Sequence, residues 1–127
     1  MKKICSLVLL FCSFTAFSQG NGDAIVGKWM KTPKETLLIE VFKSKNVYEG
    51  KIGWSTDEAK KPEGYLILQD MRYNAKGNLW EGGKILDPST GRTYNAIVRI
   101  KPDGLLEVQG YLGMKFLGSK RYFKRAD

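Results

Sequence analysis

The chain has 127 residues and carries 21 basic against 13 acidic side chains, a formal net charge of +8 at neutral pH. This length is typical of one domain with a hydrophobic core of its own. Histidine is absent and the only cysteines are Cys5 and Cys12, which excludes Ser-His and Cys-His catalysis and zinc sites built on histidine. We therefore predict a protein that is not an enzyme and that has no metal site and no cofactor.

The first 18 residues are typical of a secretory signal peptide. Two lysines precede an apolar run that ends at Phe17, and Ala16-Phe17-Ser18 has the spacing of small residues that signal peptidase recognises. Cleavage before Gln19 removes both cysteines and leaves 19 basic against 13 acidic residues, a net charge of +6. The apolar run is shorter than the about 20 residues of a spanning helix. We predict that residues 19–127 form a single exported domain, periplasmic or secreted, without a transmembrane span.

Short segments of alternating apolar and polar residues follow one another through the rest of the chain. Such period-two segments, separated by turn residues, are typical of antiparallel strands. The predicted strands are 26–30, 36–43, 47–55, 65–70, a hairpin over 80–94 whose second strand runs to 100, then 105–111 and 120–125. Segment 71–78 fits either a short helical turn or a hairpin loop, and 112–118 is predicted as an apolar loop. About eight strands without a long helix indicate an all-β sandwich or up-and-down barrel.

The central hairpin has the clearest turn chemistry. Asp87 is suited to cap the turn with its carboxylate, Pro88 fixes the next backbone angle, and Gly91 is suited to the positive φ that closes a short loop. Before the turn, Gly82 and Gly83 allow another backbone or side chain to approach closely. These residues predict a hairpin and indicate no reaction.

The chain from residue 24 to 125 resembles a bacterial family of small exported proteins known as domain of unknown function 2147. The matching residues are Ile25-Val26-Gly27-Lys28-Trp29, Gly50-Lys51-Ile52 with Trp54, the hairpin Trp80-x-Gly82-Gly83-x-Ile85-x-Asp87-Pro88 with Gly91 and Tyr94, and Gly110-Tyr111-x-Gly113 with Leu117-Gly118. Many relatives have a cysteine and a tryptophan where this chain has Glu49 and Phe123. The resemblance implies an exported barrel and names no substrate, because the family's function is unknown.

A second resemblance is to lipocalin-like barrels, and it rests on Gly27-x-Trp29 in the first strand with an arginine in the last. It implies that Trp29 closes one end of the barrel and that an arginine packs over its ring. We assign this part to Arg121, with Arg125 as the alternative. The two resemblances together favour a small antiparallel up-and-down barrel over a sandwich.

Aromatic residues at inward positions predict what the barrel interior holds. Tyr48, Trp54, Trp80 and Tyr94 are the candidates for lining a cavity, although eight-strand barrels are also narrow enough to be filled by side chains. We therefore predict a lipocalin-like barrel that binds an apolar or amphipathic small molecule. The alternative is an interaction module with a filled core that binds an anionic envelope surface or a protein through its basic face and the polar loop 56–64.

Two further functions receive less support from the sequence. Glu81 and Asp87, with Asp70 before them, suggest a carboxylate pair for glycoside hydrolysis, but a turn role for Asp87 and a salt bridge for Glu81 explain the same residues. Basic and aromatic residues together suit single-stranded nucleic acid, but the export signal argues against it. We predict no nucleic-acid partner.

Overall fold

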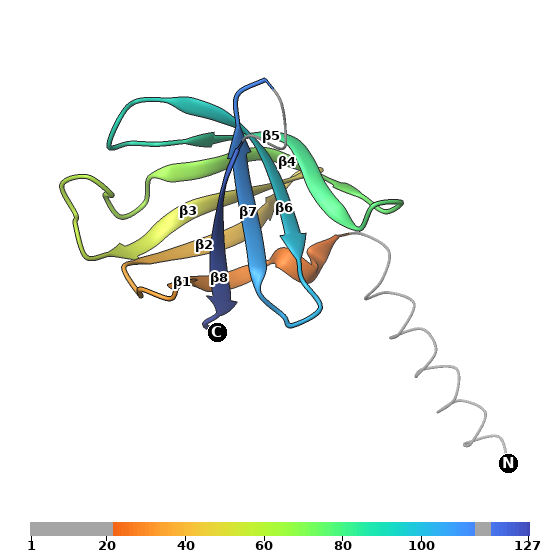
Figure 1. Ribbon diagram of the computed structural model, residues 1–127, viewed down its shortest axis with the longest axis horizontal. Helices are drawn as coiled ribbons and strands as arrows, with labels where there is room; N and C mark the ends of the chain where they lie inside the picture. Colours follow the sequence, from red (N-terminus) through yellow and green to blue (C-terminus); the bar gives the residue numbers. More distant parts are fainter. Residues whose placement is uncertain (1–21, 114–117) are drawn as a thin grey trace, which may run out of the picture.

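The computed structural model describes residues 22–113 and 118–127. Eight antiparallel strands form a closed barrel in which each strand pairs with the next along the chain and β8 pairs with β1 (Figure 1). In chain order, a 3₁₀ helix η1 (Asp23–Ile25) precedes β1 (Gly27–Thr32), β2 (Leu37–Ser44), β3 (Val47–Ser55), β4 (Leu66–Asn74), β5 (Leu79–Leu86), β6 (Thr93–Ile100), β7 (Leu106–Tyr111) and β8 (Ser119–Arg125). The predicted up-and-down barrel is confirmed.

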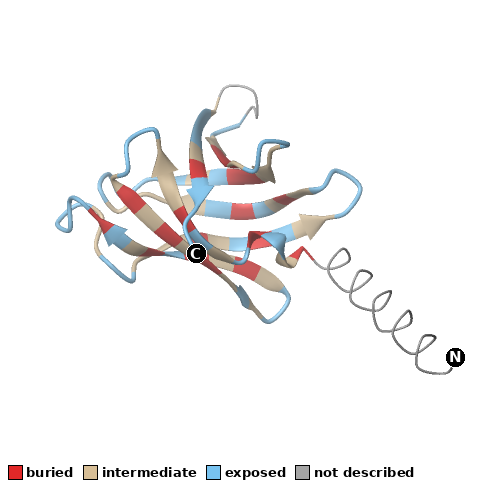
Figure 2. Ribbon diagram, turned by 90° about the horizontal axis from the view of Figure 1, so that it is seen from below, coloured by how far each residue is buried: buried red, intermediate tan, exposed pale blue. Residues whose placement is uncertain are grey.

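Alternation along each strand separates the barrel interior from its outer surface. In β2, Leu37, Ile39 and Val41 are buried and the residues between them are less so, as expected when successive side chains point to opposite faces. Figure 2 shows buried residues recurring along neighbouring strands. The core formed in this way comprises Ile25, Trp29, Leu37, Ile39, Val41, Tyr48, Ile52, Leu68, Met71, Trp80, Ala96, Val98, Leu106, Val108 and Phe123.

The ambiguous segment 71–78 divides into the second half of β4 and a turn. β4 continues to Asn74, and the turn that follows ends at Asn78, whose φ is 50°. Asp70 also has a positive φ, 59°, and lies between the buried residues Leu68 and Met71. The strand thus bulges at Asp70, which shifts the alternation by one residue.

Two predicted segments lie wholly or partly outside the described residues. These are the signal peptide over 1–18 and, in the loop predicted at 112–118, residues 114–117. Within 22–113 and 118–127, no helix has the length and apolar character required to cross a membrane.

The turn at the head of the central hairpin is confirmed. The Gly91 N–H donates to the Asp87 carbonyl at 2.8 Å, and the Asp87 N–H donates to the Arg92 carbonyl at 2.9 Å. Gly91 has a φ of 75°, in the left-handed region that favours glycine. Pro88 follows Asp87 at the position where a fixed φ favours the turn.

The two ends of the barrel are built differently (Figure 1). At the end that we call the closed end, η1 lies beside the short turns that join β2 to β3, β4 to β5 and β6 to β7. The other end, which we call the open end, carries the connections 33–36, 56–65 and 87–92, and β7 ends and β8 begins there. A candidate binding site is therefore sought at the open end.

Candidate ligand-binding cavity

Trp29 fills the closed end of the barrel. Its side chain is 1% exposed, and its indole N–H donates to the Ile25 carbonyl of η1 at 2.9 Å. The Arg125 guanidinium carbon lies 4.0 Å from the centroid of the Trp29 ring. The same guanidinium donates to the carbonyls of Val26 and Ala24 at 2.8 and 2.7 Å, so it fastens the segment around η1 to the last strand.

The assignment of Arg121 to barrel closure is therefore wrong, and Arg125 takes that part. Trp29 lies opposite Arg125 in the β1–β8 register, which places Arg121 four residues closer to the open end. Gly27 does belong to the closure. Its φ is 135°, and a Cβ there would lie 2.6 Å from the Arg125 guanidinium.

Tyr48 and Trp80, predicted to line a cavity, lie in the closed-end core instead. Trp80 is 1% exposed, donates its indole N–H to the Gly22 carbonyl at 3.0 Å, and packs on Tyr73 with ring centroids 5.0 Å apart. The Tyr48 hydroxyl donates to Asp23 at 2.5 Å. Burial and this bond to a carboxylate raise the pKa of Tyr48 well above its usual range. Both side chains hold the N-terminal segment against the barrel.

Trp54, also predicted to line a cavity, points outward and is 46% exposed. Leu38 pairs with Trp54, but the adjacent Ile39 pairs with Ile52, so β3 carries an extra residue at Gly53. A bulge of this kind shifts the inward face by one position. Ser55, which the regular alternation places outside, is buried instead.

A cavity of about 490 Å³ opens at the end of the barrel opposite η1. Tyr94, the fourth predicted residue, lies on its wall. The apolar part of the wall is formed by Leu37, Ile39, Ile67, Leu68, Ile85, Val108 and Phe123. Side chains thus fill the interior at the closed end, and the cavity lies at the open end.

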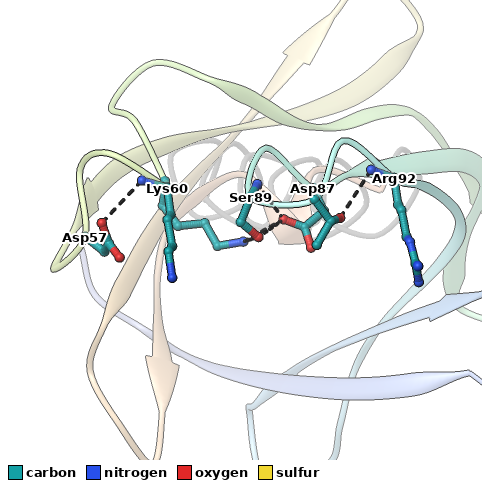
Figure 3. A network of polar contacts seen from close by, with 7 residues as sticks. Asp57, Lys60, Asp87, Ser89 and Arg92 are labelled. Carbon is teal, nitrogen blue, oxygen red and sulfur yellow. Dashed lines mark hydrogen bonds and ion pairs between the residues drawn. The ribbon is translucent and has the colours of Figure 1, made fainter.

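An ion pair joins the two loops that flank the cavity, 56–65 and 87–92. The Lys61 ammonium lies 2.9 Å from the Asp87 carboxylate, which also accepts from the Ser89 hydroxyl at 2.6 Å and from the Ser89 N–H at 2.9 Å. Figure 3 shows Asp87 and Ser89 beside the loop that contains Asp57 and Lys60. Burial opposes the charge on Asp87, but these bonds outweigh it and hold the pKa of Asp87 well below its usual range.

Asp87→Asn is expected to lower the free energy of unfolding by about 1–2 kcal/mol at pH 7, because it removes one charge of the pair. A carboxyl whose pKa is depressed by folding stabilises the protein above its unfolded pKa, near 3.9, and loses that effect as the pH falls toward the folded pKa. Urea unfolding between pH 7 and 3 should therefore show the difference between variant and parent shrinking below about pH 4. A constant difference would contradict the assignment.

The carboxylates considered for hydrolysis do not form a pair. Glu81 accepts from the Asn74 side chain at 2.8 Å, beside the turn between β4 and β5, whereas Asp87 lies at the open end. Six steps along the extended chain, at about 3.3 Å each, separate the two residues by about 20 Å. This exceeds the separation of the two carboxyl groups in glycosidases, roughly 5–10 Å.

A protein-family sequence model described as "Uncharacterized protein conserved in bacteria (DUF2147)" matches residues 27–125. The chain belongs to this family. The match begins in β1 and ends at Arg125 in β8, so it spans all eight strands of the barrel. No curated protein matches the chain significantly.

Among solved structures, the DUF2147 barrel is similar to protein HP1028 from the human pathogen Helicobacter pylori, which is described as belonging to the lipocalin family. The two chains share 19% identity with a TM-score of 0.68, over 81% of this chain and 83% of that one. At this identity the likeness shows the fold alone. The lipocalin-like architecture inferred from Gly27-x-Trp29 is confirmed.

Two cationic residues of the cavity wall, Lys31 and Arg121, were not predicted to line a cavity, although the alternation along their strands places them at inward positions. Inward positions continue at intervals of two from Trp29 to Lys31 and from Phe123 to Arg121, and both cations line the cavity. Lys31 is half-buried and Arg121 is exposed, so these cations lie at the rim of the cavity.

Proposed function

We propose that this protein is an exported, non-catalytic binding protein that holds an apolar or amphipathic small molecule in its open-end cavity. The observation that carries the proposal is the cavity itself, about 490 Å³, in which aliphatic side chains form one part of the wall and polar and charged side chains the other. Small-molecule sites typically have volumes of about 300–1,000 Å³ and combine apolar surface with polar groups that orient the ligand. The lipocalin description of the similar Helicobacter pylori protein supports the same function.

The apolar part of the wall accounts for affinity toward apolar chains without requiring one particular ligand. Each methylene group transferred from water to such a wall contributes about 0.8 kcal/mol. A micromolar complex requires about 8 kcal/mol in total. An alkyl chain or ring system of about ten carbons thus accounts for useful affinity without any specific bond, which favours an amphipathic metabolite or lipid over a small polar one.

Two features support the remaining parts of the proposal. Absence of histidine and the wide separation of Glu81 and Asp87 favour binding without turnover. The basic, apolar and small-residue order of residues 1–18 favours export and cleavage before Gln19. Edman sequencing of protein recovered from periplasmic and culture fractions tests the export: a mature chain that begins elsewhere than near Gln19, or a chain confined to the cytoplasm, would contradict it.

Ile85→Trp is expected to weaken binding of the neutral fluorophore N-phenyl-1-naphthylamine at least tenfold, because the larger side chain occupies cavity volume. Ile85 is a half-buried cavity residue of β5. Lys84→Trp is the matched control: it adds the same side chain one position earlier, where the residue is exposed. Fluorescence titration of the parent and both variants, with melting temperatures measured in parallel, provides the comparison.

Equal loss in both variants, or no fluorescence enhancement in the parent, would contradict a cavity binder. Native mass spectrometry of protein purified gently from an exporting host is the complementary measurement. Additional mass that disappears on denaturation identifies the class of the natural occupant by its weight.

A further inference from the structure

Two cations occupy inward register positions on neighbouring strands at the open end of the barrel. Lys31 lies two residues beyond Trp29 on β1 and pairs with Phe123 of β8. Arg121 lies two residues before Phe123, on the same face of β8, opposite the inward Val108. Both line the cavity; Lys31 is half-buried, and Arg121 is exposed at the rim. In neighbouring antiparallel strands such diagonal positions are about 7–8 Å apart, so two positive charges share one side of the rim.

These two cations have no carboxylate partner among the described residues, in contrast to Lys61 at the same rim. Among the described residues, no carboxylate lies within 4.0 Å of the charged nitrogens of Lys31 or Arg121, and the same holds for Lys60 of the adjacent loop. The Arg121 guanidinium donates to the carbonyl of its neighbour Lys120 at 3.1 Å. By contrast, Arg125 at the closed end has Asp127 nearby, and Lys61 is paired with Asp87.

The two aspartates that line the cavity do not cancel this charge. Asp87 is neutralised by Lys61. Asp57 accepts from the Lys60 backbone N–H at 3.3 Å, while its own N–H donates to the Ser55 hydroxyl oxygen at 3.0 Å. Three cations (Lys31, Lys60 and Arg121) therefore face a single carboxylate around the rim, and the mouth of the cavity is net positive.

We propose that the ligand is an anionic single-chain amphiphile, whose carboxylate headgroup is bound between Lys31 and Arg121 and whose chain lies on the apolar wall. Like charges that share a partly enclosed site repel each other, and an anion placed between them relieves the repulsion. The arginine guanidinium presents paired donors that match a carboxylate, and bonds between ionised groups are the stronger ones. The inference rests on the proposed function, because it specifies the ligand of the same cavity.

Three ten-carbon probes of different charge test it: decanoate, decanol and decyltrimethylammonium, each used below its micelle concentration to displace N-phenyl-1-naphthylamine at pH 8. For the parent protein, decanoate is expected to bind at least tenfold more tightly than decanol, and the ammonium probe more weakly than decanol. In Lys31→Met/Arg121→Met, decanoate affinity should fall to that of decanol, while decanol affinity changes less than about threefold.

Lys28→Met/Lys120→Met is the matched control. It removes two positive charges from the same two strands, at exposed positions on the outer face, and should change decanoate binding by less than about twofold. Lys31→Arg/Arg121→Lys keeps both charges and should keep the preference for decanoate. If the double methionine variant fails to fold, the single variants Lys31→Gln and Arg121→Gln replace it, and each should lose at least threefold of that preference.

The outcomes separate the two proposals. If neither the fluorophore nor any probe binds the parent, the proposed function itself fails. If the probes bind but decanol equals decanoate, or if the outer-face control loses as much decanoate affinity as the rim variant, the cavity binder stands and the anionic headgroup is overturned.

Discussion

Trp29→Ala is expected to lower the free energy of unfolding by about 3–5 kcal/mol, the range for truncation of a fully buried large aromatic residue. The indole fills the closed end of the barrel and is 1% exposed. Its removal leaves a cavity, deprives the Ile25 carbonyl of its donor, and takes away the ring on which Arg125 stacks. Three kinds of interaction are lost at one position.

Trp54→Ala provides the matched comparison, because it removes the same side chain from the outer surface. Trp54 is 46% exposed, so its loss should change the free energy of unfolding by less than about 1 kcal/mol. Urea unfolding followed by circular dichroism measures both variants without relying on the fluorescence that each substitution alters. Similar losses of unfolding free energy in the two variants would contradict the assignment of Trp29 as the residue that fills the closed end.

The effect on ligand binding separates the two ends of the barrel. Trp29 lies away from the open-end cavity, so Trp29→Ala, at a temperature where it remains folded, should keep its affinity for N-phenyl-1-naphthylamine within about threefold. A larger loss would show that the closed end controls the cavity.

Local sequence patterns were sufficient for most of the strands and for the hairpin turn, but they left the second half of β4 undecided. The alternation of Leu37, Ile39 and Val41 identified β2, and Asp87, Pro88 and Gly91 identified the hairpin turn, because the information lies within a few neighbouring residues. The Gly27-x-Trp29 pattern also identified the closed end. Arg121 and Arg125 share the inner face of β8, however, and only the β1–β8 register decides which of them meets Trp29.

The bulges explain most of what the sequence did not show. Period-two alternation places Trp54 on the same face as Tyr48 and Ile52, and a single extra residue at Gly53 reverses that placement. Glycine permits a bulge without requiring one. The bulge at Asp70 was harder to predict from the sequence, since an aspartate at positive φ is uncommon. Most cavity residues were not predicted, because the prediction rested on aromatic side chains, whereas the wall consists mainly of aliphatic, charged and hydroxyl side chains.

Gly83→Ala is expected to destabilise the protein by about 3 kcal/mol, at the upper end of typical overpacking effects. β4 and β5 both bulge here, at Asp70 and at Gly82, whose φ values are 59° and 81°. The bulged backbone of β4 therefore passes directly over Gly83. A Cβ at Gly83 would collide with the Gln69 carbonyl oxygen and lie 2.7 Å from the Asp70 carbonyl carbon. Backbone atoms cannot move aside as a flexible side chain does.

Gly82→Ala is the control that distinguishes the steric clash at Gly83 from the backbone strain that replacing a glycine of positive φ causes. Gly82 has the positive φ, but the nearest atom to a Cβ there is the Arg72 Cδ, 4.0 Å away. Only backbone strain opposes that substitution, and its expected effect is about 1–2 kcal/mol. Equilibrium unfolding of the two variants should therefore rank Gly83→Ala as the more damaging. The reverse order would mean that positive φ, rather than the contact between bulged strands, is what requires the glycine pair, and the paired-bulge geometry of β4 and β5 would be wrong.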